Sequence, residues 1–235
     1  GPVTYRNCFT NNDVYGNTQT GVFVGVPHSD DHVFDNCYAA GKIEGSDTIG
    51  GFASCHQGAR SNVLKHCYST SQVGMSDGGV NMGGFIGVVG SGSTVFSFEN
   101  CYAAGEVGSL KSNDAGQALK WDSASGSWTV VSSVGGFAGA VSTSSGYSFS
   151  NCYYDKQTTG SKENAIGTTK DGAVVGLSGM LTKSLTQVNL GGSFTVKNAT
   201  YPQLNVFLRG QAPSWGGDQA LADNANAYSQ ASAST

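Results

Sequence analysis

The cluster of side chains best suited to metal chemistry is His28-Ser29-Asp30-Asp31-His32. Two histidines four residues apart bind zinc when a helix aligns them and a glutamate follows the first. Here Ser29 follows the first histidine and Pro27 precedes it, so we expect a polar loop rather than a zinc site. Asp30, Asp31 and Asp35 offer hard oxygen ligands, which makes calcium the alternative cofactor, although no spaced acidic repeat follows them.

A second set of potential metal ligands combines Cys55-His56 with His66-Cys67. The spacing of the two pairs is not typical of zinc sites, and Cys67 belongs to a regular series that recurs once in each of five similar segments. Equivalent residues of stacked parallel strands lie about 4.8 Å apart with parallel Cβ directions, whereas a disulfide needs Cβ atoms about 3.8 Å apart and turned toward each other. We therefore predict a ladder of buried free thiols, inert as nucleophiles, formed by Cys8, Cys37, Cys67, Cys101 and Cys152.

Catalysis of polysaccharide cleavage would need clustered carboxylates, often with a lysine or arginine, on one face of adjacent repeats. Asp47, Asp77 and Asp114 fall in the same loop half of the repeat, with Lys42 and Lys111 nearby. They do not fall at matching offsets from the cysteines. We therefore predict a protein that is not an enzyme, and a β-helical polysaccharide-active enzyme remains the catalytic alternative.

Two tryptophans are the best candidates for ligand binding. Trp121 and Trp128 lie in the segment 119–131, whose polar centre between β-prone arms predicts a β-hairpin within an insertion at 106–133. The functional hypothesis is an exposed aromatic surface for a sugar ring or a protein partner, since tryptophan is enriched at binding hot spots. The structural hypothesis is an aromatic pair that clasps the hairpin onto the rest of the chain.

Two short sequence motifs, called phrases below, alternate along the chain, and their spacing predicts the fold. One phrase ends in cysteine and an aromatic residue, and the other places Phe after glycine; 14 to 16 residues lead from each such Phe to the next cysteine. Regular self-similarity at about 30 residues predicts a repeat architecture. The first phrase occurs as Asn7-Cys8-Phe9, Asn36-Cys37-Tyr38, His66-Cys67-Tyr68, Asn100-Cys101-Tyr102 and Asn151-Cys152-Tyr153, and the second as 21–25, 50–52, 83–87 and 135–139.

We predict an all-β parallel β-solenoid, or β-helix, of about four coils, with the hairpin insertion and a C-terminal cap at about 155–208. Small residues two positions after the cysteines, with the exception of Tyr154 after Cys152, indicate a narrow interior, which places the aromatic row on the opposite side. Tyr38, Tyr68 and Tyr102 of that row either bind a ligand or pack under a neighbouring loop. Where Asn precedes a cysteine of the series, it is expected in a left-handed bend with an amide ladder. The glycine pairs are expected to supply positive φ and close backbone approach.

Composition excludes several classes of protein. The 235 residues carry a net charge of −4, only 12% are charged and 35 are glycine. The balance provides no basic surface for nucleic acid, and no apolar run reaches the roughly 18 residues that membrane insertion requires. Gly1-Pro2 is interpreted as the scar of a cleaved tag, and 209–235 as a linker or the start of another module, because Ala, Ser, Asn and Gln dominate it.

The alternation of 36–41 and 100–105 with 83–87 resembles the GLUG-motif repeat family of bacterial surface and secreted proteins, which includes adhesins and parts of immunoglobulin-A-cleaving metallopeptidases. The resemblance covers about 5–155, and Tyr201-Pro202-Gln203-Leu204 is similar to the family's usual ending. This sequence departs from the family motif in using Phe where the motif commonly has Leu. The resemblance implies an extracellular or cell-surface module without catalytic residues, whose partners are neighbouring domains and a host or cell-wall protein or glycan.

Overall fold

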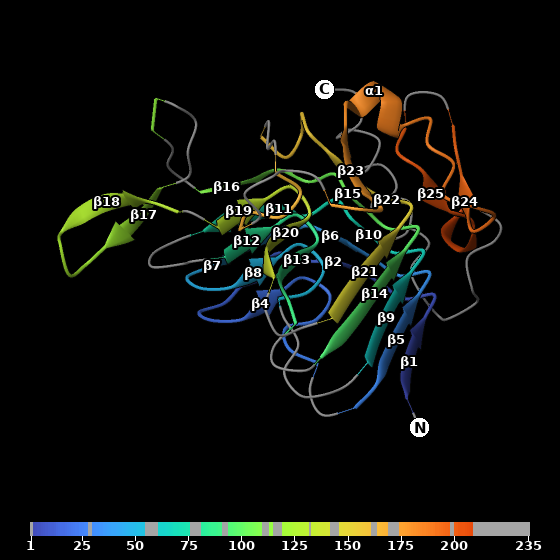
Figure 1. Cartoon of the computed structure of the whole chain (residues 1–235), viewed down its shortest axis with the longest axis horizontal. Coiled ribbons are helices and arrows are strands. Elements are labelled where there is room, and N and C mark those ends of the chain that lie inside the picture. The colour runs from blue at the N-terminus through green and yellow to red at the C-terminus, as the bar shows by residue number, and fades with distance from the viewer. Residues whose placement is uncertain are drawn as a thin grey trace.

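A computed structural model describes residues 2–27, 30–54, 61–75, 81–90, 94–109, 113–114, 119–131, 133–141, 146–160, 164–168, 174–197 and 200–208. Nearly all of the regular structure in these residues consists of short β-strands, most of which pair in parallel (Figure 1). The predicted all-β class with parallel sheets is therefore confirmed.

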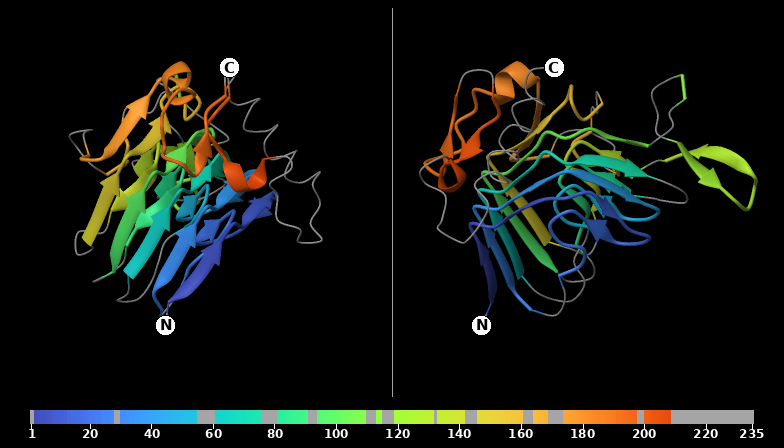
Figure 2. Two further views of the ribbon diagram at one scale, coloured as in Figure 1. Left: turned by 90° about the vertical axis from the view of Figure 1, so that its right-hand side faces the viewer. Right: turned by 180° about the vertical axis from the view of Figure 1, so that it is seen from behind.

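Sheet A contains one strand from each of five repeats, in sequence order. Every pair in it is parallel, and the residue before each Asn-Cys or His-Cys phrase pairs with its counterpart in the next repeat. Figure 2 shows the five strands as a row that begins with the N-terminal strand. They are β1 (Val3–Arg6), β5 (His32–Asp35), β9 (Ser61–Lys65), β14 (Val95–Glu99) and β21 (Gly146–Ser150).

Sheet B follows sheet A in each repeat and carries the aromatic row. Its register aligns Phe9, Tyr38, Tyr68, Tyr102 and Tyr153 on successive strands. A sixth strand from beyond the repeats adds to its C-terminal edge. The order is β2 (Phe9–Asn11), β6 (Tyr38–Ala40), β10 (Tyr68–Ser69), β15 (Tyr102–Ala103), β22 (Cys152–Asp155) and β23 (Leu177–Met180).

Three smaller parallel sheets complete the repeats. Sheet C consists of β3 (Val14–Tyr15), β7 (Lys42–Gly45), β11 (Gln72–Met75) and β16 (Val107–Ser109). Sheet D consists of β4 (Thr20–Gly21), β8 (Ile49–Gly50), β12 (Asn81–Gly83) and β19 (Ser133–Gly135). Sheet E consists of β13 (Ile86–Val89) and β20 (Ala138–Val141), extended by parallel bridges at Val24, Ala53 and Ile166.

The chain turns from sheet A to sheet B at a single left-handed residue. Asn7, Asn36, His66, Asn100 and Asn151 all have φ between 52° and 55°. The predicted left-handed bend is confirmed, and Asn suits it because a short polar side chain tolerates this region better than most. The bend shifts the alternation of faces by one, so that Phe34 and Cys37, three residues apart, both reach the inner core.

One hydrophobic core lies between the sheets. All five sheets contribute to it, and equivalent aromatic rings stack along it. Phe23, Phe52, Phe85 and Phe137 lie with ring centroids 4.7, 4.9 and 4.8 Å apart, nearly parallel. Rings from sheet A meet this stack edge to face, as Phe34 does with Phe52 at 88°. Both arrangements are favoured geometries for aromatic pairs.

The glycine pairs before these phenylalanines serve close approach and not positive φ. None of the residues in 50–51, 83–84 and 135–136 has positive φ. A Cβ atom on Gly50 would lie 2.0 Å from the Ala53 carbonyl oxygen, and one on Gly51 would lie 2.2 Å from the Gly84 carbonyl oxygen of the next repeat. Of the two predicted uses of glycine, the structure therefore supports the second alone.

The C-terminal segment forms the predicted end cap in part. Residues 164–167 and β23 extend the stack at its C-terminal end, where Ile166 bridges to Ala138 and β23 pairs with β22, whereas residues 181–197 and 200–208 run along the outer face of sheet B (Figures 1 and 2). The apolar side chains of this segment require a second partner surface, and the tyrosines of sheet B supply it. The segment, here called the strap, contains α1 (Thr182–Leu185), β24 (Phe194–Thr195), β25 (Gln203–Leu204) and the 3₁₀ turn η1 (Asn205–Phe207).

The predicted hairpin is present. It pairs β17 (Leu119–Asp122) with β18 (Ser127–Val130) in antiparallel register. The hairpin projects from the stacked sheets on the side opposite the strap (Figure 1). The predicted linker at 209–235 lies outside the described residues.

Candidate functional site

The hairpin has one apolar face. Trp121 pairs directly with Trp128, and Leu119 pairs with Val130 two positions further along the strands. Residues at these spacings share one face of a two-stranded sheet, because side chains alternate along a strand. The intervening positions, 120, 122, 127 and 129, are polar in sequence. The two pairs therefore place four apolar side chains together.

The turn of the hairpin is fixed by a carboxylate and a glycine. Asp122 Oδ1 accepts a hydrogen bond from the Ala124 amide (3.1 Å), and Asp122 Oδ2 accepts one from Ser125 Oγ (2.6 Å). Gly126 has φ of +61° with open space around it, so its conformation, and not a lack of room, calls for glycine. The turn thereby sets the register that brings the tryptophans opposite each other.

The two indole rings form an edge-to-face pair, not a flat double platform. Their centroids are 5.6 Å apart and their planes meet at 66°. Trp128 is 42% exposed and Val130 46%, while Trp121 is half-buried. The hairpin projects, so the predicted clasp onto the repeats is not seen, but the predicted cross-strand pair is. The surface that can meet a ligand is therefore Trp128 with Val130 beside it.

Tyr38, Tyr68 and Tyr102 cannot receive a ligand in this structure, which corrects one of our predictions. All three are fully buried. Their rings stack at 4.8 Å from repeat to repeat, within 3° and 6° of parallel. The strap covers them, with Phe207 edge-on to Tyr38 at 5.0 Å and Phe194 beside Tyr68 and Tyr102. Of the two readings of the row, packing under a neighbouring segment is the correct one.

Two buried hydroxyl groups attach the strap. Tyr102 Oη donates to the Pro202 carbonyl oxygen at 2.7 Å, and Tyr201 Oη donates to Asp155 Oδ2 at 2.7 Å. Asp155 is itself buried, and its Oδ1 accepts from the amides of Gln157 and Thr158. Burial raises the pKa of Tyr102 and of Tyr201, so both phenols keep their protons. Sequence reasoning missed Asp155, since nothing local marks its partner 46 residues away.

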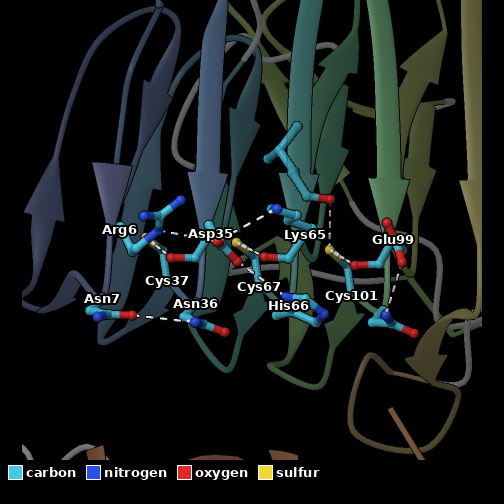
Figure 3. Close-up of polar contacts among 12 residues, drawn as sticks. Arg6, Asn7, Asp35, Asn36, Cys37, Lys65, His66, Cys67, Glu99 and Cys101 are labelled. Carbon is cyan, nitrogen blue, oxygen red and sulfur yellow. Dashed lines mark hydrogen bonds and ion pairs between the residues drawn. The ribbon is translucent and has the colours of Figure 1, made fainter. Parts of the chain in front are cut away.

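A row of polar groups follows the left-handed bends (Figure 3). Asn36 Nδ2 donates to Asn7 Oδ1 at 3.3 Å, and Asn151 Nδ2 donates to Asn100 Oδ1 at 2.6 Å. The predicted amide ladder therefore exists in two segments. His66 occupies the Asn position between them and turns its Nδ1 to Asp35 Oδ1 at 3.1 Å instead.

Asp35 is the electrostatic centre of this corner. Its carboxylate meets Arg6 Nε at 3.3 Å and Lys65 Nζ at 3.6 Å as well as His66. Asp31 Oδ1 accepts from the Ser61 amide, and Asp30 is exposed. No group of three or more His, Cys, Asp or Glu is placed to hold a metal among the described residues. The calcium hypothesis for Asp30, Asp31 and Asp35 therefore finds no geometry here; His28, Cys55 and His56 lie outside the described part.

The described cysteines are free and form the predicted row, with one exception to its burial. Cys37, Cys67, Cys101 and Cys152 are buried, but Cys8 is exposed because no repeat covers its outer side. Each thiol donates to the carbonyl oxygen two residues before it, across the left-handed bend, as Cys67 Sγ does to Lys65 at 3.2 Å. Burial raises the pKa of Cys67 and Cys152. The thiols thus complete the bend, and the buried Cys67 and Cys152 are poor nucleophiles.

Two of the residues considered for polysaccharide cleavage have local partners in the structure. Lys42 forms an ion pair with Glu44, and Asp47 Oδ1 accepts from Thr48 Oγ1 at 3.2 Å. Asp77 and Lys111 lie outside the described residues.

The charges of the corner row were not anticipated, although the sequence contains a signal for them. The residue before each bend is Arg6, Asp35, Lys65, Glu99 and Ser150, so the first four alternate in sign. Their register pairing in sheet A places these residues in one line.

Helices in the described residues are too short and polar to cross a bilayer. Comparison with protein-family models, with curated proteins and with solved structures finds no match to this chain.

Proposed function

We propose that the chain is a non-catalytic β-solenoid module of a bacterial cell-surface or secreted protein, which acts as a stalk and carries an adhesive hairpin. The solenoid extends the stacked parallel sheets into one elongated core, and the resemblance to GLUG-motif repeats supports the extracellular role. The observation that carries the proposal is the separation of tasks in the fold. The recurring rings of the middle repeats, such as Tyr38 and Phe52, are buried, whereas the projecting hairpin exposes Trp128 together with Val130.

The stacked repeats suit a spacer because their stability adds from one repeat to the next. Each repeat contacts chiefly its neighbours, and a repeat alone has strands of two to five residues that cannot bury a core. Such a body holds an inserted element at a fixed distance from its ends. The hairpin arises in the loop half of the fourth repeat, where an insertion leaves the pairing of β12 with β19 intact.

The hairpin suits a binding role because it presents apolar surface that the rest of the molecule does not cover. Trp128 and Val130 lie two positions apart on β18, on the same face of the hairpin, and both are exposed. The turn at Asp122 fixes the register of the hairpin that carries them. Large exposed aromatic side chains on a rigid element are typical of binding hot spots. The second candidate function is carbohydrate binding by Trp121 and Trp128. It is favoured by the exposed indole of Trp128, which offers an aromatic surface to a sugar ring.

A binding screen tests this proposal. The intact protein is applied to a glycan array and to surface-immobilised host and cell-wall proteins, together with Trp128→Ala, Trp121→Ala and a matched control, Tyr147→Ala. Tyr147 is as exposed as Trp128 but lies on sheet A. We expect Trp128→Ala to weaken binding about 30-fold, as truncation of a hot spot costs about 2 kcal/mol, while Tyr147→Ala binds normally.

Three results would count against the proposal. Equal binding by the wild type and Trp128→Ala would exclude the hairpin as the adhesive surface. Loss of binding in Tyr147→Ala would place the surface on the repeats. Turnover of any polysaccharide in a parallel activity screen would overturn the non-catalytic role.

A further inference from the structure

The buried thiols form a row with a constant step from one repeat to the next. Each has the same position at its bend, with Sγ 3.2 to 3.4 Å from the carbonyl oxygen two residues before it. The tyrosines that directly follow three of these cysteines stack with ring centroids 4.8 Å apart. The buried members of the row are Cys37, Cys67, Cys101 and Cys152.

The sulfur atoms of neighbouring repeats are therefore held at a set separation. Because each thiol has the same geometry at its bend, its sulfur is shifted from the next by about the step of the adjacent rings, 4.8 Å. Figure 3 shows Cys37, Cys67 and Cys101 in equivalent positions along the row. The Cys67 thiol interacts electrostatically with the thiols on both sides. This separation is too long for a disulfide, whose S–S bond is about 2.05 Å.

The same separation fits one metal ion between two sulfur atoms. A metal–thiolate bond is about 2.3 Å long, so a linear sulfur–metal–sulfur unit spans about 4.6 Å. Side chains of stacked strands stand across the stacking direction. The lone pairs of each sulfur can therefore point along the row toward its neighbours. Two successive thiols thus provide two ligands in line, already at the distance that a bridging ion requires.

The row selects the kind of ion. Structural zinc requires four ligands in a tetrahedron, and calcium prefers several oxygen ligands, whereas each position between two repeats offers two sulfur atoms. Thiolates select soft ions such as Cu(I), and a filled d shell allows this ion to accept two ligands in line. The geometry of the row therefore suits Cu(I) better than zinc or calcium.

Burial of the row favours an ion with a single positive charge. When Cu(I) binds between two thiols, one Sγ–H bond breaks, the proton leaves to solvent, and the ion bonds to the thiolate and to the neutral sulfur beside it. One positive charge replaces another, so the net charge of the apolar core does not change, which avoids the cost of burying an uncompensated charge. The proton that leaves was a weak hydrogen-bond donor to a carbonyl oxygen.

We propose that neighbouring buried thiols of the row bind a soft monovalent cation, Cu(I), in linear two-coordinate sites, with Cys67 and Cys101 as the central pair. Both side chains are fully buried, so the ion is shielded from water and exchanges only when the repeats open locally. The inference rests on the stacking of the repeats and is independent of the adhesive role of the hairpin.

Two double variants with equal numbers of thiols test whether adjacency matters. Cys37→Ala with Cys152→Ala leaves the neighbouring thiols Cys67 and Cys101. Cys67→Ala with Cys152→Ala leaves Cys37 and Cys101, which lie two steps apart and cannot share one ion. The two variants differ only in which thiols of the row remain, so each is the matched control of the other.

The measurement is retention of copper against a competing chelator. Both variants and a parent protein are built with Cys8→Ser and Cys55→Ser, which removes the two thiols outside the buried row. Each is refolded from urea with Cu(I) in the absence of oxygen, challenged with bathocuproine disulfonate, and examined by native mass spectrometry. We expect the adjacent pair to retain one Cu(I) and to bind it at least about 100-fold more tightly than the separated pair, since two ligands on one frame act together.

Each outcome decides the inference. Equal retention by the two folded variants would mean that single thiols bind copper independently, and loss of all copper from the folded parent would exclude the site. X-ray absorption of the loaded parent should show two sulfur neighbours per copper; a third ligand would contradict the linear geometry. Far-UV circular dichroism establishes folding, and if a double variant does not fold, copper retention and X-ray absorption of the parent decide.

Discussion

Three consecutive residues form each corner, where the chain turns from sheet A to sheet B. The left-handed Asn redirects the backbone, the thiol after it donates to the carbonyl two residues earlier, and the aromatic ring packs on the outer face of sheet B. The Asn bend and the thiol row could be predicted from the sequence, because both follow from residue type and recurrence. The burial of Tyr38, Tyr68 and Tyr102 could not. Alternation assigns a face to a ring, but the segment that covers it lies some 100 residues away, as the Tyr102–Pro202 hydrogen bond shows.

A pair of tyrosine substitutions distinguishes packing from hydrogen bonding in this row. Tyr38 Oη is buried with no hydrogen-bond partner among the described residues, whereas Tyr102 Oη donates to Pro202. Removing a buried unsatisfied hydroxyl relieves a desolvation cost, so Tyr38→Phe should raise the free energy of unfolding by about 1 kcal/mol. Tyr102→Phe should lower it by about 1 kcal/mol, since the Pro202 carbonyl loses its donor. Urea unfolding measures both; equal effects would contradict the assigned partners.

His66 offers a test of the amide ladder. It occupies an Asn position, and Asn36 Oδ1 is buried without a donor beneath it. His66→Asn should supply that donor and join the two segments of the ladder, while Asp35 keeps Arg6 and Lys65. We expect the free energy of unfolding to rise by about 0.5 to 1 kcal/mol. His66→Ala is the control and should lower the free energy of unfolding. If His66→Asn lowers it as well, the hydrogen bond from His66 to Asp35 contributes more stability than a continuous amide ladder would.

At the scale of elements, the hairpin was predictable and the strap was not. The hairpin has a local signal, a polar turn between β-prone arms, and the register found in β17 and β18 follows from it. The strap was expected to cover the end of the stack, since a last rung exposes an edge. Instead its apolar residues pack along the flank of sheet B, and the end is covered by β23 and by residues 164–167. The local sequence pattern shows that such a segment must pack on another surface. It does not predict whether that surface is the end of the stack or the outer face of sheet B.

The strap should depend on Asp155 more than on any one hydrophobic contact. Asp155→Ala removes the acceptor of Tyr201 Oη and of two amides. We expect a loss of about 2 to 3 kcal/mol, because the buried Tyr201 hydroxyl and two partly buried amides lose their partner. Tyr201→Phe, the matched control, removes one of these bonds and should cost about 1 kcal/mol.

Hydrogen exchange locates the effect of these strap variants. In Asp155→Ala, amides of α1, β24 and β25 should exchange faster while those of sheet A keep their protection, as expected of a separate cooperative unit. Uniform acceleration throughout sheets A and B would show that the strap does not open independently.

For the whole molecule, the buried phenols predict how stability depends on alkaline pH. Burial raises the pKa of Tyr38, Tyr102 and Tyr201 above the usual value. A group whose pKa is raised on folding contributes stability that is complete below its unfolded pKa, about 10, and is lost as pH rises above it. The contribution of these tyrosines to the free energy of unfolding should thus stay constant up to about pH 10 and fall steeply at higher pH.

Phenolate absorbance at 295 nm tests this dependence. In urea all ten tyrosines of the chain should titrate together near pH 10. In the native protein part of the signal should appear only when circular dichroism shows unfolding. A full native titration near pH 10 with the sheets intact would contradict the buried row.

The repeat pattern made most of the architecture predictable, since strands from equivalent positions pair in parallel across all five sheets. Features that occur only once could not be predicted from the repeat pattern. These are the strap, the role of Asp155 and the ion pairs around Asp35. These depend on contacts between segments with no shared pattern. The proposed solenoid rests on the recurrent part alone.

The most direct test of that solenoid is the spacing of equivalent residues. Val33, Val63, Ser97 and Ser148 are successive register partners in sheet A. Spin labels are placed at position 148 and at one of the other three, in a Cys8→Ser, Cys55→Ser background, and distances are measured by electron paramagnetic resonance. Stacking at about 4.8 Å per strand predicts mean separations near 5, 10 and 14 Å, which increase in steps from 97 to 63 to 33. Separations that do not increase with repeat number would contradict a single stack.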